Sequence, residues 1–544
     1  MKNFDELKNL GLETMTDSTS IATASRDASI FQVNPEAVIY PKNSEEIKKL
    51  AAWVTQNKSS DPSLSITARS GGTDMSGGPL NESIILDFTK YFNQIGQVSD
   101  GLATTQPGVY YRDFEKATLS TGQLMPAYTA SREICTVGGM VANNSGGEKS
   151  LAYGKTERYV KKLKTVLSDG DEYVFEPMTL AGLEEKKSQQ NFEGQIYRSV
   201  YDLIESNYDL IQKSKPDVSK NSAGYYLWNV WDRKVFDLTK LLVGSQGTLG
   251  LVTEIDFSLI KPKKYSKILV IFLNSLDPLG EIVNEVLKFN PESFESFDDH
   301  TFKIAMKFLP QLFDQVGSNL FSLFFKFLPE IGMVISGGVP KLILIAEFTS
   351  NEDVEAHNRM KQAQEAMARF KVKTHLVETI SEAEKYWKIR RESFNLLRKH
   401  AGKQHSAPFI DDIVVHPSQL PQFLPQLNNL IGQYKGLTYT IAGHAGDANF
   451  HVIPLMDFRL PENRRAIPEL SEKVYDLVAS MHGSITGEHN DGIVRTPYLP
   501  KMFSPEMIDL FEKTKNIFDP LNIFNPGKKV HGSKEYMLNH IISE

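Results

Sequence analysis

Two short segments near the end of the chain contain residue types that can bind a metal ion and move protons. The first contains His444 and His451, and the second contains Glu488 followed directly by His489. Two imidazoles and a carboxylate are the usual ligand set of a catalytic divalent-metal site, and a neighbouring imidazole can serve as a base. These residue types therefore indicate metal-assisted chemistry.

The two histidines can act together only if the chain turns between them. Residues 437–444 and 449–453 are apolar and β-branched, which predicts a hairpin with its turn at Gly446 and Asp447. Along one straight strand the two imidazoles would point to opposite faces, whereas across a turn they can face each other. A histidine on a strand is more often an ordinary surface or core residue, and with 12 histidines in the chain some cluster by chance. That interpretation stays open.

Length and composition limit the class of protein. A chain of 544 residues is expected to contain two or three hydrophobic cores. A net charge of −7 without a long basic stretch argues against nucleic acid as a partner. The single cysteine, Cys135, excludes disulfides and any iron–sulfur cluster bound by this chain alone. The N-terminus has no apolar core of the signal-peptide type, so a cytoplasmic location is expected.

The most apolar region is 302–345, which Lys326 and Glu330 interrupt before it reaches the length of a membrane span. Two interpretations are open for it. It is a buried helical region of a large domain, or it is a surface that contacts a partner subunit or lies peripherally at the inner face of a membrane.

The first glycine-rich loop lies between two predicted strands. A helix is expected over 41–57, with Asn43 and Glu46 at the spacing of a capping box. A strand over 64–68, a loop over 69–78 and a strand over 83–88 follow. Glycines expose main-chain N–H groups that can donate to an anion, although such loops are also ordinary turns. The loop matches neither the common dinucleotide fingerprint nor the P-loop.

Two further loops of this kind follow, at 137–147 and 244–250, with a hairpin predicted over 163–175. Three such loops fit one extended phosphate-bearing ligand better than three unrelated turns. From about 266 the pattern alternates between strands and helices, which is typical of an α+β domain. The final segment, 518–528, is rich in turn residues and is expected to dock on the rest of the protein.

Five motifs together resemble one known family: Ser70–Ser76, Thr136–Gly139, Asn143–Gly146, Gly247–Gly250 and Asn525–Lys528. They resemble the FAD-linked oxidases with a vanillyl-alcohol-oxidase-type (PCMH-type) FAD domain, and among these the D-2-hydroxyacid dehydrogenases, which include D-lactate and D-2-hydroxyglutarate dehydrogenases and the large flavin subunit of glycolate oxidase. The resemblance extends from Arg26 to Lys528. It implies an α+β protein with a two-part FAD-binding domain and a substrate (cap) domain built on a ferredoxin-like sheet. The expected divisions are an N-terminal arm (1–34), the FAD-binding domain (35–265), the cap with the metal site (266–505) and a C-terminal return (506–544).

The resemblance also implies which residues bind FAD. Relatives that tether FAD covalently place a histidine in the first loop, where this chain has Thr73 and Asp74, so noncovalent binding is expected. Asp74, and Asn490 after the Gly-Glu-His segment, replace the glycines that are more usual in the family. The residues expected to bind FAD are Ser70, Gly71, Gly72, Thr73, Asp74, Met75, Ser76, Thr136, Gly138, Gly139, Asn143, Ser145, Gly146, Gly247, Thr248, Gly250 and Asn525.

The resemblance implies roles for the residues near the end of the chain. His444, His451 and Glu488 are expected to bind a divalent ion, most simply zinc, with manganese or iron as alternatives. His489 is expected to be the base. Arg390 matches the family's Trp-x-x-Arg segment at the position that binds the substrate carboxylate, with Arg391 as the alternative or an exposed basic helix face as the ordinary interpretation. Ile410 stands where some relatives have a lysine, so no residue here supports a dicarboxylate pocket.

The expected function is oxidation of a D-2-hydroxy acid, similar to lactate, glycolate or 2-hydroxyglutarate, to the 2-oxo acid, with the hydride passed to FAD. The electrons then need a separate acceptor: an iron–sulfur protein, an electron-transfer flavoprotein or a quinone. Two alternatives are an ether-forming flavoenzyme similar to alkylglycerone-phosphate synthase and a flavin-binding electron-transfer subunit of a larger complex.

Overall fold

The computed structural model describes residues 4–299, 339–379, 382–384, 386–388, 390–391, 404–434 and 437–543. The chain forms two compact units, each built from separate stretches of sequence. Unit 1 consists of Met1–Gly147, Gly154–Pro262 and Ser484–Glu544, and unit 2 consists of Glu148–Tyr153 and Lys263–Gly483.

The chain returns to unit 1 at Ser484, earlier than the expected boundary at 505, and residues 1–34 are part of unit 1. The early return has a local cause, because the segment after Gly483 finds its hydrogen-bond partners in unit 1. Ser484 Oγ donates to Asn221 Oδ1 at 2.7 Å. Unit 1 therefore contains Glu488 and His489, which the sequence had placed in the cap.

Unit 1 contains a four-stranded sheet in the order β1-β2-β4-β3. Its strands β2 and β3 both run parallel to β4, and β1 is antiparallel to β2. The strands are β1 (Glu13–Met15), β2 (Ala37–Tyr40), β3 (Ile66–Arg69) and β4 (Ile84–Asp87). The two predicted strands on either side of the first glycine-rich loop are thus confirmed as β3 and β4.

The helix expected over 41–57 is α3 (Ser44–Asn57), which begins a little later than predicted. The N-cap Asn43 explains the start: Glu46 N donates to Asn43 Oδ1 at 3.1 Å, and Glu46 Oε2 accepts from Lys42 N, just before the cap, at 2.9 Å. Both bonds satisfy main-chain N–H groups that have no partner inside the helix.

A second sheet of unit 1 is antiparallel, in the order β5-β6-β11-β7-β8. Its strands are β5 (Ile95–Ser99), β6 (Leu102–Thr105), β7 (Val160–Val166), β8 (Glu172–Phe175) and β11 (Leu251–Ser258). The hairpin predicted over 163–175 is β7 and β8, paired from Val166 with Glu172 to Leu163 with Phe175. Two short strands, β9 (Met178–Thr179) and β10 (Val235–Phe236), form a separate pair.

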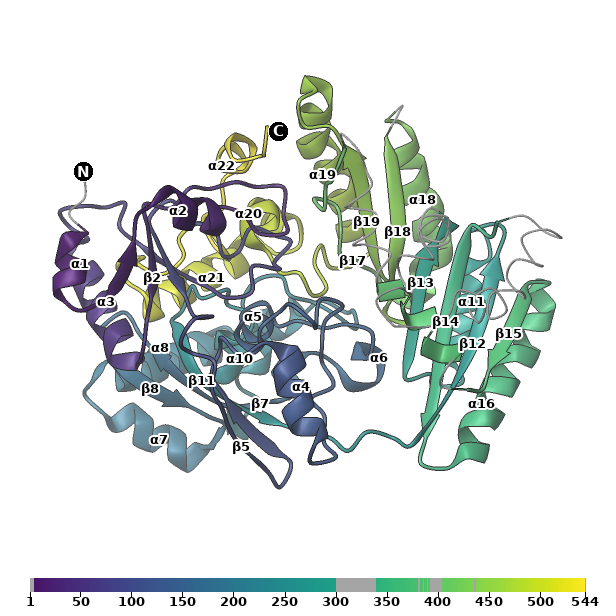
Figure 1. Cartoon of the computed structure of the whole chain (residues 1–544), viewed down its shortest axis with the longest axis horizontal. Helices are drawn as coiled ribbons and strands as arrows, with labels where there is room; N and C mark the ends of the chain where they lie inside the picture. Colours follow the sequence, from purple (N-terminus) through teal and green to yellow (C-terminus); the bar gives the residue numbers. More distant parts are fainter. Residues whose placement is uncertain are drawn as a thin grey trace. The chain divides into compact units, whose positions relative to one another are not determined.

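The helices of unit 1 connect and cover these sheets (Figure 1). They are α1 (Asp5–Asn9), α2 (Ser18–Ala24), α4 (Tyr111–Leu119), α5 (Val137–Asn143), α7 (Leu180–Ser188), α8 (Phe192–Ser206), α9 (Tyr208–Lys213), α10 (Thr239–Leu242), α20 (Gly492–Arg495), α21 (Pro505–Phe518) and α22 (Lys534–Asn539).

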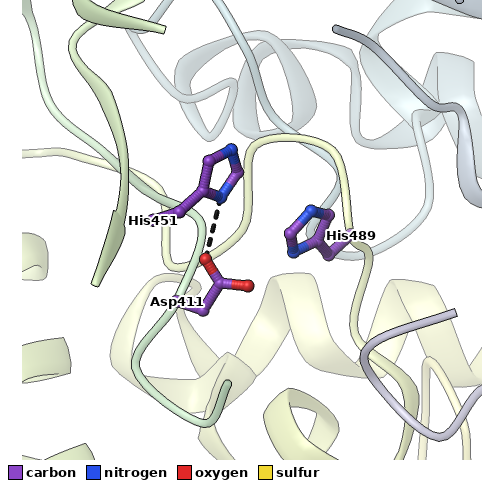
Figure 2. Close-up of side chains that lie close together, drawn as sticks. All are labelled: Asp411, His451 and His489. Carbon is purple, nitrogen blue, oxygen red and sulfur yellow. Dashed lines mark hydrogen bonds and ion pairs between the residues drawn. The ribbon is translucent and has the colours of Figure 1, made fainter. Parts of the chain in front are cut away.

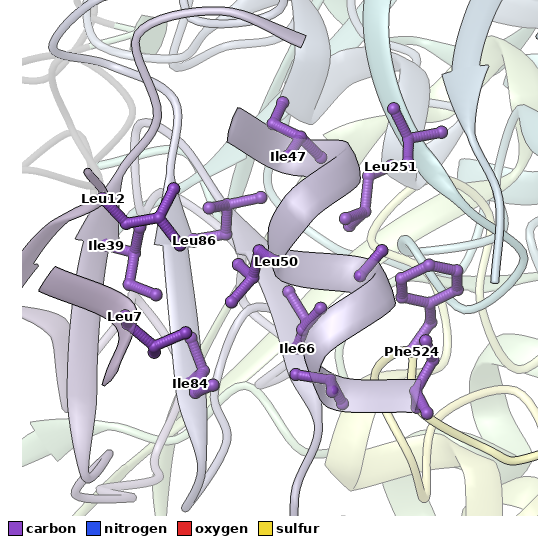
Figure 3. Packing of buried hydrophobic residues seen from close by; sticks show 14 of the residues in the cluster. Leu7, Leu12, Ile39, Ile47, Leu50, Ile66, Ile84, Leu86, Leu251 and Phe524 are labelled. Carbon is purple, nitrogen blue, oxygen red and sulfur yellow. The ribbon is translucent and has the colours of Figure 1, made fainter. Parts of the chain in front are cut away.

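One hydrophobic cluster joins the two larger sheets of unit 1 with the C-terminal segment (Figure 3). Its fully buried members include Ile47 and Leu50 on α3, Ile84 on β4, Leu251 on β11 and Phe524 near the C-terminus. Residues separated by nearly the whole length of the chain therefore share one core, and removal of this apolar surface from water stabilises unit 1.

The C-terminal segment docks on β3, as its turn-rich composition predicts. Ile66 N donates to Ile523 O at 2.7 Å, and Asn525 N donates to Ile66 O at 2.9 Å. These bonds extend the edge of the four-stranded sheet by one short parallel bridge between Ile66 and Phe524. The edge strand β3 is thus covered by the chain's own terminus.

Unit 2 is built on an eight-stranded sheet in the order β15-β12-β14-β13-β18-β19-β16, with β17 also paired to β19. All of its strand pairs are antiparallel. The strands are β12 (Tyr265–Leu273), β13 (Ser293–Asp298), β14 (Leu342–Ser350), β15 (Lys373–Val377), β16 (His405–Ser406), β17 (Ile413–Val414), β18 (Thr438–His444) and β19 (Asn449–Met456).

The first part of this sheet has the order expected of a ferredoxin-like unit. The described elements follow each other as β12, α11, β13, β14, α16 and β15, and β12 lies between β15 and β14. Helix α11 contacts α16 and α18, and α18 contacts α19, so the four helices form a continuous layer. Their bounds are α11 (Leu279–Leu287), α16 (Asp353–Ala366), α18 (Leu420–Gly432) and α19 (Pro461–Ser480); α6 (Ser150–Tyr153) also belongs to unit 2.

Most of the apolar region 302–345 lies outside the described residues, which resume at 339 and enter β14 at Leu342. Both interpretations of that region therefore stay predictions. Among the described helices, no helix combines the length and the apolar character needed to cross a membrane.

The N-terminal segment closes over the first glycine-rich loop of unit 1. Ala28 N donates to Asp74 O at 2.8 Å, and Asp27 Oδ1 accepts from Ser29 N at 2.9 Å. Among the described residues, the other oxygen of Asp27 is buried without a hydrogen-bond partner. Burial, together with the nearby negative charge of Asp74, raises the pKa of Asp27 to about 7.

Replacement of Leu50 by alanine should lower the free energy of unfolding of unit 1 by about 2–5 kcal/mol, because it leaves a cavity in a closed core. Lys49→Ala, at the exposed neighbouring position of the same helix, is the matched control and should change stability little. Urea denaturation followed by circular dichroism measures both. Equal effects of the two substitutions would show that the cluster does not hold unit 1 together.

Replacement of Asp27 by asparagine should remove a pH-dependent loss of stability. Because the folded-state pKa is raised above the ordinary value near 4, folding favours the protonated form, and that contribution is lost as the pH rises from about 4 through about 7. Asp27→Asn stays neutral, so its stability relative to the wild type should increase over this interval and reach about 1–3 kcal/mol near pH 8. Urea midpoints at pH 5, 6, 7 and 8 test this; a constant difference at all four would be incompatible with it.

Candidate active site

The hairpin with the two histidines forms as predicted. His444 is paired with Asn449 across the turn, and His451 lies two residues further along β19 on the same face. The two imidazole centroids are 5.4 Å apart and the ring planes meet at 82°. Phe450 and Val452, which alternate with His451 along the strand, are fully buried. The turn therefore places both imidazoles in one small region of unit 2.

Each imidazole is oriented by its own buried carboxylate. His444 Nδ1 lies 2.7 Å from Glu295 Oε1, and His451 Nδ1 lies 2.8 Å from Asp411 Oδ1, as Figure 2 shows for the second pair. A carboxylate that accepts from Nδ1–H favours the tautomer in which Nε2 keeps its lone pair. This carboxylate–histidine arrangement is the one that metal-binding histidines commonly show.

The two candidate arginines have different surroundings in unit 2. Arg390 is 8% exposed, and its Nη2 lies 3.0 Å from Glu295 Oε2. Arg391 pairs instead with Glu148, with Nε 3.1 Å from Glu148 Oε2 and a second contact from Nη2. Arg390 therefore shares a carboxylate with His444, whereas Arg391 pairs with a different one.

In unit 1 the segment with Glu488 and His489 is held by buried lysines. Lys220 Nζ lies 3.0 Å from Glu488 Oε2, with both side chains at most 8% exposed. Lys155 Nζ donates to Gly487 O at 2.7 Å, just before Glu488. A buried carboxylate is costly without an opposite charge, and Lys220 supplies that charge beside Glu488.

A buried lysine also holds Asn490 and Asp491, the two residues that follow His489. Lys529 Nζ lies 2.7 Å from Asp491 Oδ2, with both side chains fully buried, and it also donates to Asn490 Oδ1 at 2.8 Å. Asn490 adopts a positive φ of 69°, which explains why an asparagine can replace glycine here, since asparagine tolerates the left-handed region. The departure from the usual glycine therefore preserves the shape of the loop.

The same asparagine connects this segment to two of the glycine-rich loops. Asn490 Nδ2 donates to Gly244 O at 2.9 Å and to Asn143 O at 3.1 Å. Gly492 N donates to Gln246 Oε1 at 2.8 Å. The segment with Glu488 and His489 and the glycine-rich loops are thus one hydrogen-bonded assembly within unit 1.

The three glycine-rich loops also bind one another. Thr136 Oγ1 donates to Ser70 Oγ at 2.5 Å, and Asn143 Nδ2 donates to Asp74 Oδ2 at 2.7 Å, which joins the first loop to the second. Gln246 in the third loop donates to Asn143 Oδ1 at 3.2 Å. The three loops therefore lie together in unit 1, an arrangement that suits one shared ligand.

Asp74 and Asn525 organise these loops from within. Asp74 Oδ1 accepts from Ser76 Oγ at 2.7 Å, so this unusual aspartate folds its own loop. Asn525 Nδ2 donates to Gly78 O at 2.9 Å and to Gln246 O at 2.7 Å. The C-terminal return is therefore fixed to the first and third loops.

The residues predicted to bind FAD divide into two groups. Partly exposed residues can face a ligand: Ser70, Gly71, Gly72, Thr73, Asp74, Met75, Gly138, Gly139, Asn143 and Gly247. Buried residues support them from behind: Ser76, Thr136, Ser145, Gly146, Thr248, Gly250 and Asn525.

In the partly exposed group, the glycines leave the main chain uncovered by side chains. A Cβ atom at Gly71 would lie 2.7 Å from Ile134 O and one at Gly138 would lie 2.6 Å from Pro107 O, so only glycine allows these close approaches. Preformed glycine-rich loops can donate main-chain N–H groups to an anion, so they fit an extended phosphate-bearing cofactor such as FAD.

Three residues that support the candidate site were not identified from the sequence. Glu295 and Asp411 orient the histidines, and Lys220 holds Glu488. A signal for Glu295 existed, because it is an acid between phenylalanine and serine residues inside the fully buried strand Ser293–Asp298. No local pattern marks Lys220 as buried, since its partner is far away in the sequence.

Two family models match this chain. The FAD binding domain matches residues 35–175, and the C-terminal domain of FAD linked oxidases matches residues 262–529. The chain is 27% identical over 539 residues to D-2-hydroxyglutarate dehydrogenase of Escherichia coli (strain K12), which covers 96% of this chain and 51% of that protein. The chain thus spans about half the length of this relative.

Glycolate oxidase subunit GlcD of Bacillus subtilis (strain 168) is 27% identical over 506 residues, which covers 92% of this chain and 89% of that protein. Among solved structures, 4-ethylphenol oxidase from Gulosibacter chungangensis superimposes with a TM-score of 0.67 at 13% identity, over 98% of this chain and 97% of that one. This structural likeness confirms the expected fold. The chain belongs to the FAD-linked oxidases with a PCMH-type FAD-binding domain.

Proposed function

We propose that this protein is an FAD-dependent, metal-assisted dehydrogenase that oxidises a D-2-hydroxy acid to the 2-oxo acid. The observation that carries the proposal lies within unit 1, where the segment with Glu488 and His489 is bonded through Asn490 to the glycine-rich loops of the FAD-binding domain. The names of the relatives, which refer to 2-hydroxyglutarate and glycolate, support the same class of substrate.

FAD, bound noncovalently, would supply the acceptor for the hydride of the α-carbon. The partly exposed loop residues of unit 1 would hold it, with main-chain N–H groups toward its phosphates. Thr73 and Asp74 occupy the loop positions where covalent relatives carry a histidine, which supports noncovalent binding.

A divalent ion would be held by His444, His451 and Glu488. The orienting carboxylates Glu295 and Asp411 support this role, because they favour imidazole tautomers suited to metal binding. Such an ion would lower the pKa of a substrate hydroxyl; zinc, manganese and iron all suit this ligand set.

The side chains of the protein would perform two tasks on the substrate. Arg390 would bind the carboxylate of the acid, since a guanidinium matches the geometry of a carboxylate. His489, partly exposed beside buried Glu488, would take the proton of the α-hydroxyl as the α-hydrogen leaves with its electron pair. One residue thus positions the substrate and the other removes its proton.

The electrons would pass to a separate acceptor, either an iron–sulfur protein, an electron-transfer flavoprotein or a quinone. The one cysteine of this chain, Cys135, is buried, and burial raises the pKa of its thiol to about 11. A single buried thiol cannot hold an iron–sulfur cluster, because such clusters need several cysteine ligands. Any iron–sulfur cluster that receives the electrons would therefore lie outside these 544 residues.

Mixing the purified protein with a panel of D- and L-2-hydroxy acids should bleach the flavin absorbance with one or more D acids. Enzyme treated with a chelator that stays yellow should lose this reduction by about 100-fold or more, and zinc, manganese or iron should restore it. Bleaching by no acid would instead favour the ether-forming or the electron-transfer alternative. Undiminished bleaching after metal removal would refute the metal-assisted mechanism.

The two arginines should respond differently to substitution. Arg390→Met should lower kcat/KM for the acid by about 100-fold, because it removes a charge-assisted contact to the substrate carboxylate. Arg391→Met, the matched control, loses the pairing with Glu148 and the cation–π contact with Trp387, and it should change kcat/KM by less than about fivefold. Steady-state kinetics with an artificial acceptor measures both, and the reverse pattern would assign the carboxylate to Arg391.

A further inference from the structure

Glu295 occupies a central place in the sheet of unit 2. It lies on β13, between β14 and β18, and its side chain is 1% exposed. β13 pairs with β18 through Ser296 and Gly443, and Glu295 and His444 are the next residues along their strands. Strand pairing therefore brings the Glu295 carboxylate directly to His444.

The two oxygens of Glu295 contact two different proposed functional groups. Oε1 lies 2.7 Å from His444 Nδ1, and Oε2 lies 3.0 Å from Arg390 Nη2. The first contact is a hydrogen bond, and the second is an ion pair between a buried carboxylate and a guanidinium. Opposite charges attract strongly where water is excluded. A rigid carboxylate thus sets the separation between the imidazole and the guanidinium.

We propose that Glu295 is a positioning residue that couples the proposed carboxylate-binding Arg390 to the proposed metal ligand His444. This inference rests on the proposed function. A 2-hydroxy acid carries its carboxylate and its α-oxygen at a fixed separation, so the protein groups that recognise the two must also be held at a fixed separation. Glu295 does this from one buried strand and thereby sets the selectivity for an α-carboxylate.

Asp411 provides a matched comparison in the same unit. It orients His451 through Oδ1 in the way that Glu295 orients His444, and it is also fully buried. Arg390, however, contacts Glu295. Glu295→Gln and Asp411→Asn each remove one charge from beside one histidine, whereas only the first changes the described ion pair with Arg390.

The decisive measurement is the preference of the enzyme for an acid over its amide. The acid that bleaches the flavin fastest is compared with its primary amide, for example D-lactate with D-lactamide, at saturating metal. Glu295→Gln should lower the ratio of the two kcat/KM values by about tenfold or more, since a glutamine cannot accept from both partners. Asp411→Asn should leave this ratio within about twofold of the wild type.

A second readout does not depend on turnover. The affinity of metal-free protein for Zn²⁺, measured by competition with a chelator, should fall about tenfold to hundredfold in both variants, because each loses an orienting carboxylate. Thermal unfolding and retained flavin colour confirm that the variants are folded. If Glu295→Gln does not fold, Glu295→Asp replaces it, since the shorter side chain cannot reach both partners.

A double substitution tests whether Glu295 acts through Arg390. Glu295→Gln combined with Arg390→Met should lower the acid preference no further than Arg390→Met alone. Equal losses of preference in Glu295→Gln and Asp411→Asn would overturn the inference, because the effect would then come from the metal. An unchanged preference in Arg390→Met would overturn both this inference and the role of Arg390. Bleaching by no acid would refute the proposed function itself.

Discussion

A buried charge needs an opposite charge or several hydrogen bonds, and this constraint determines how both units are built. Unit 1 contains ion pairs whose side chains are at most 8% exposed, among them Lys515 with Asp519, Lys529 with Asp491 and Lys220 with Glu488. Burial lowers the pKa of the Lys515 and Lys529 ammonium groups, and the paired carboxylates oppose that effect. Loss of either member would leave an uncompensated charge in the interior, which proteins tolerate poorly.

Two of these pairs lie beside the segments proposed to bind FAD and to carry the base His489. Lys515 Nζ donates to Phe524 O at 2.7 Å and to Thr248 O at 2.7 Å, so it joins the C-terminal return to the third glycine-rich loop. Lys529 holds Asp491 and Asn490, next to the proposed base His489. The last forty residues of the sequence thus stabilise the segment that carries Glu488 and His489. Interior ion pairs of this kind add little net stability, but they fix a single arrangement of the groups around them.

In unit 2 the same constraint applies to two buried carboxylates, whose partners are imidazoles and a guanidinium. Glu295 and Asp411 are buried beside donors: each accepts a hydrogen bond from a histidine, and Glu295 also forms an ion pair with Arg390. The carboxylates of this polar cluster are at most 1% exposed, and the low dielectric of such an interior strengthens each electrostatic contact. Segment Glu148–Tyr153 belongs to this unit although its neighbours in sequence do not, and its Glu148 binds Arg391. Adjacent arginines therefore acquire different partners.

The sequence by itself determined the local elements and the residue types of the site. The Asn43 cap of α3, the hairpin of β18 and β19 and the α+β class all follow from short-range patterns, because periodicity and turn residues act over a few positions. Only the tertiary structure decided that Glu295 serves both His444 and Arg390, that Lys220 pairs with Glu488 268 residues away, and that the chain re-enters unit 1 at Ser484. These contacts depend on which strands pair and which charges are buried together, and no local pattern records either.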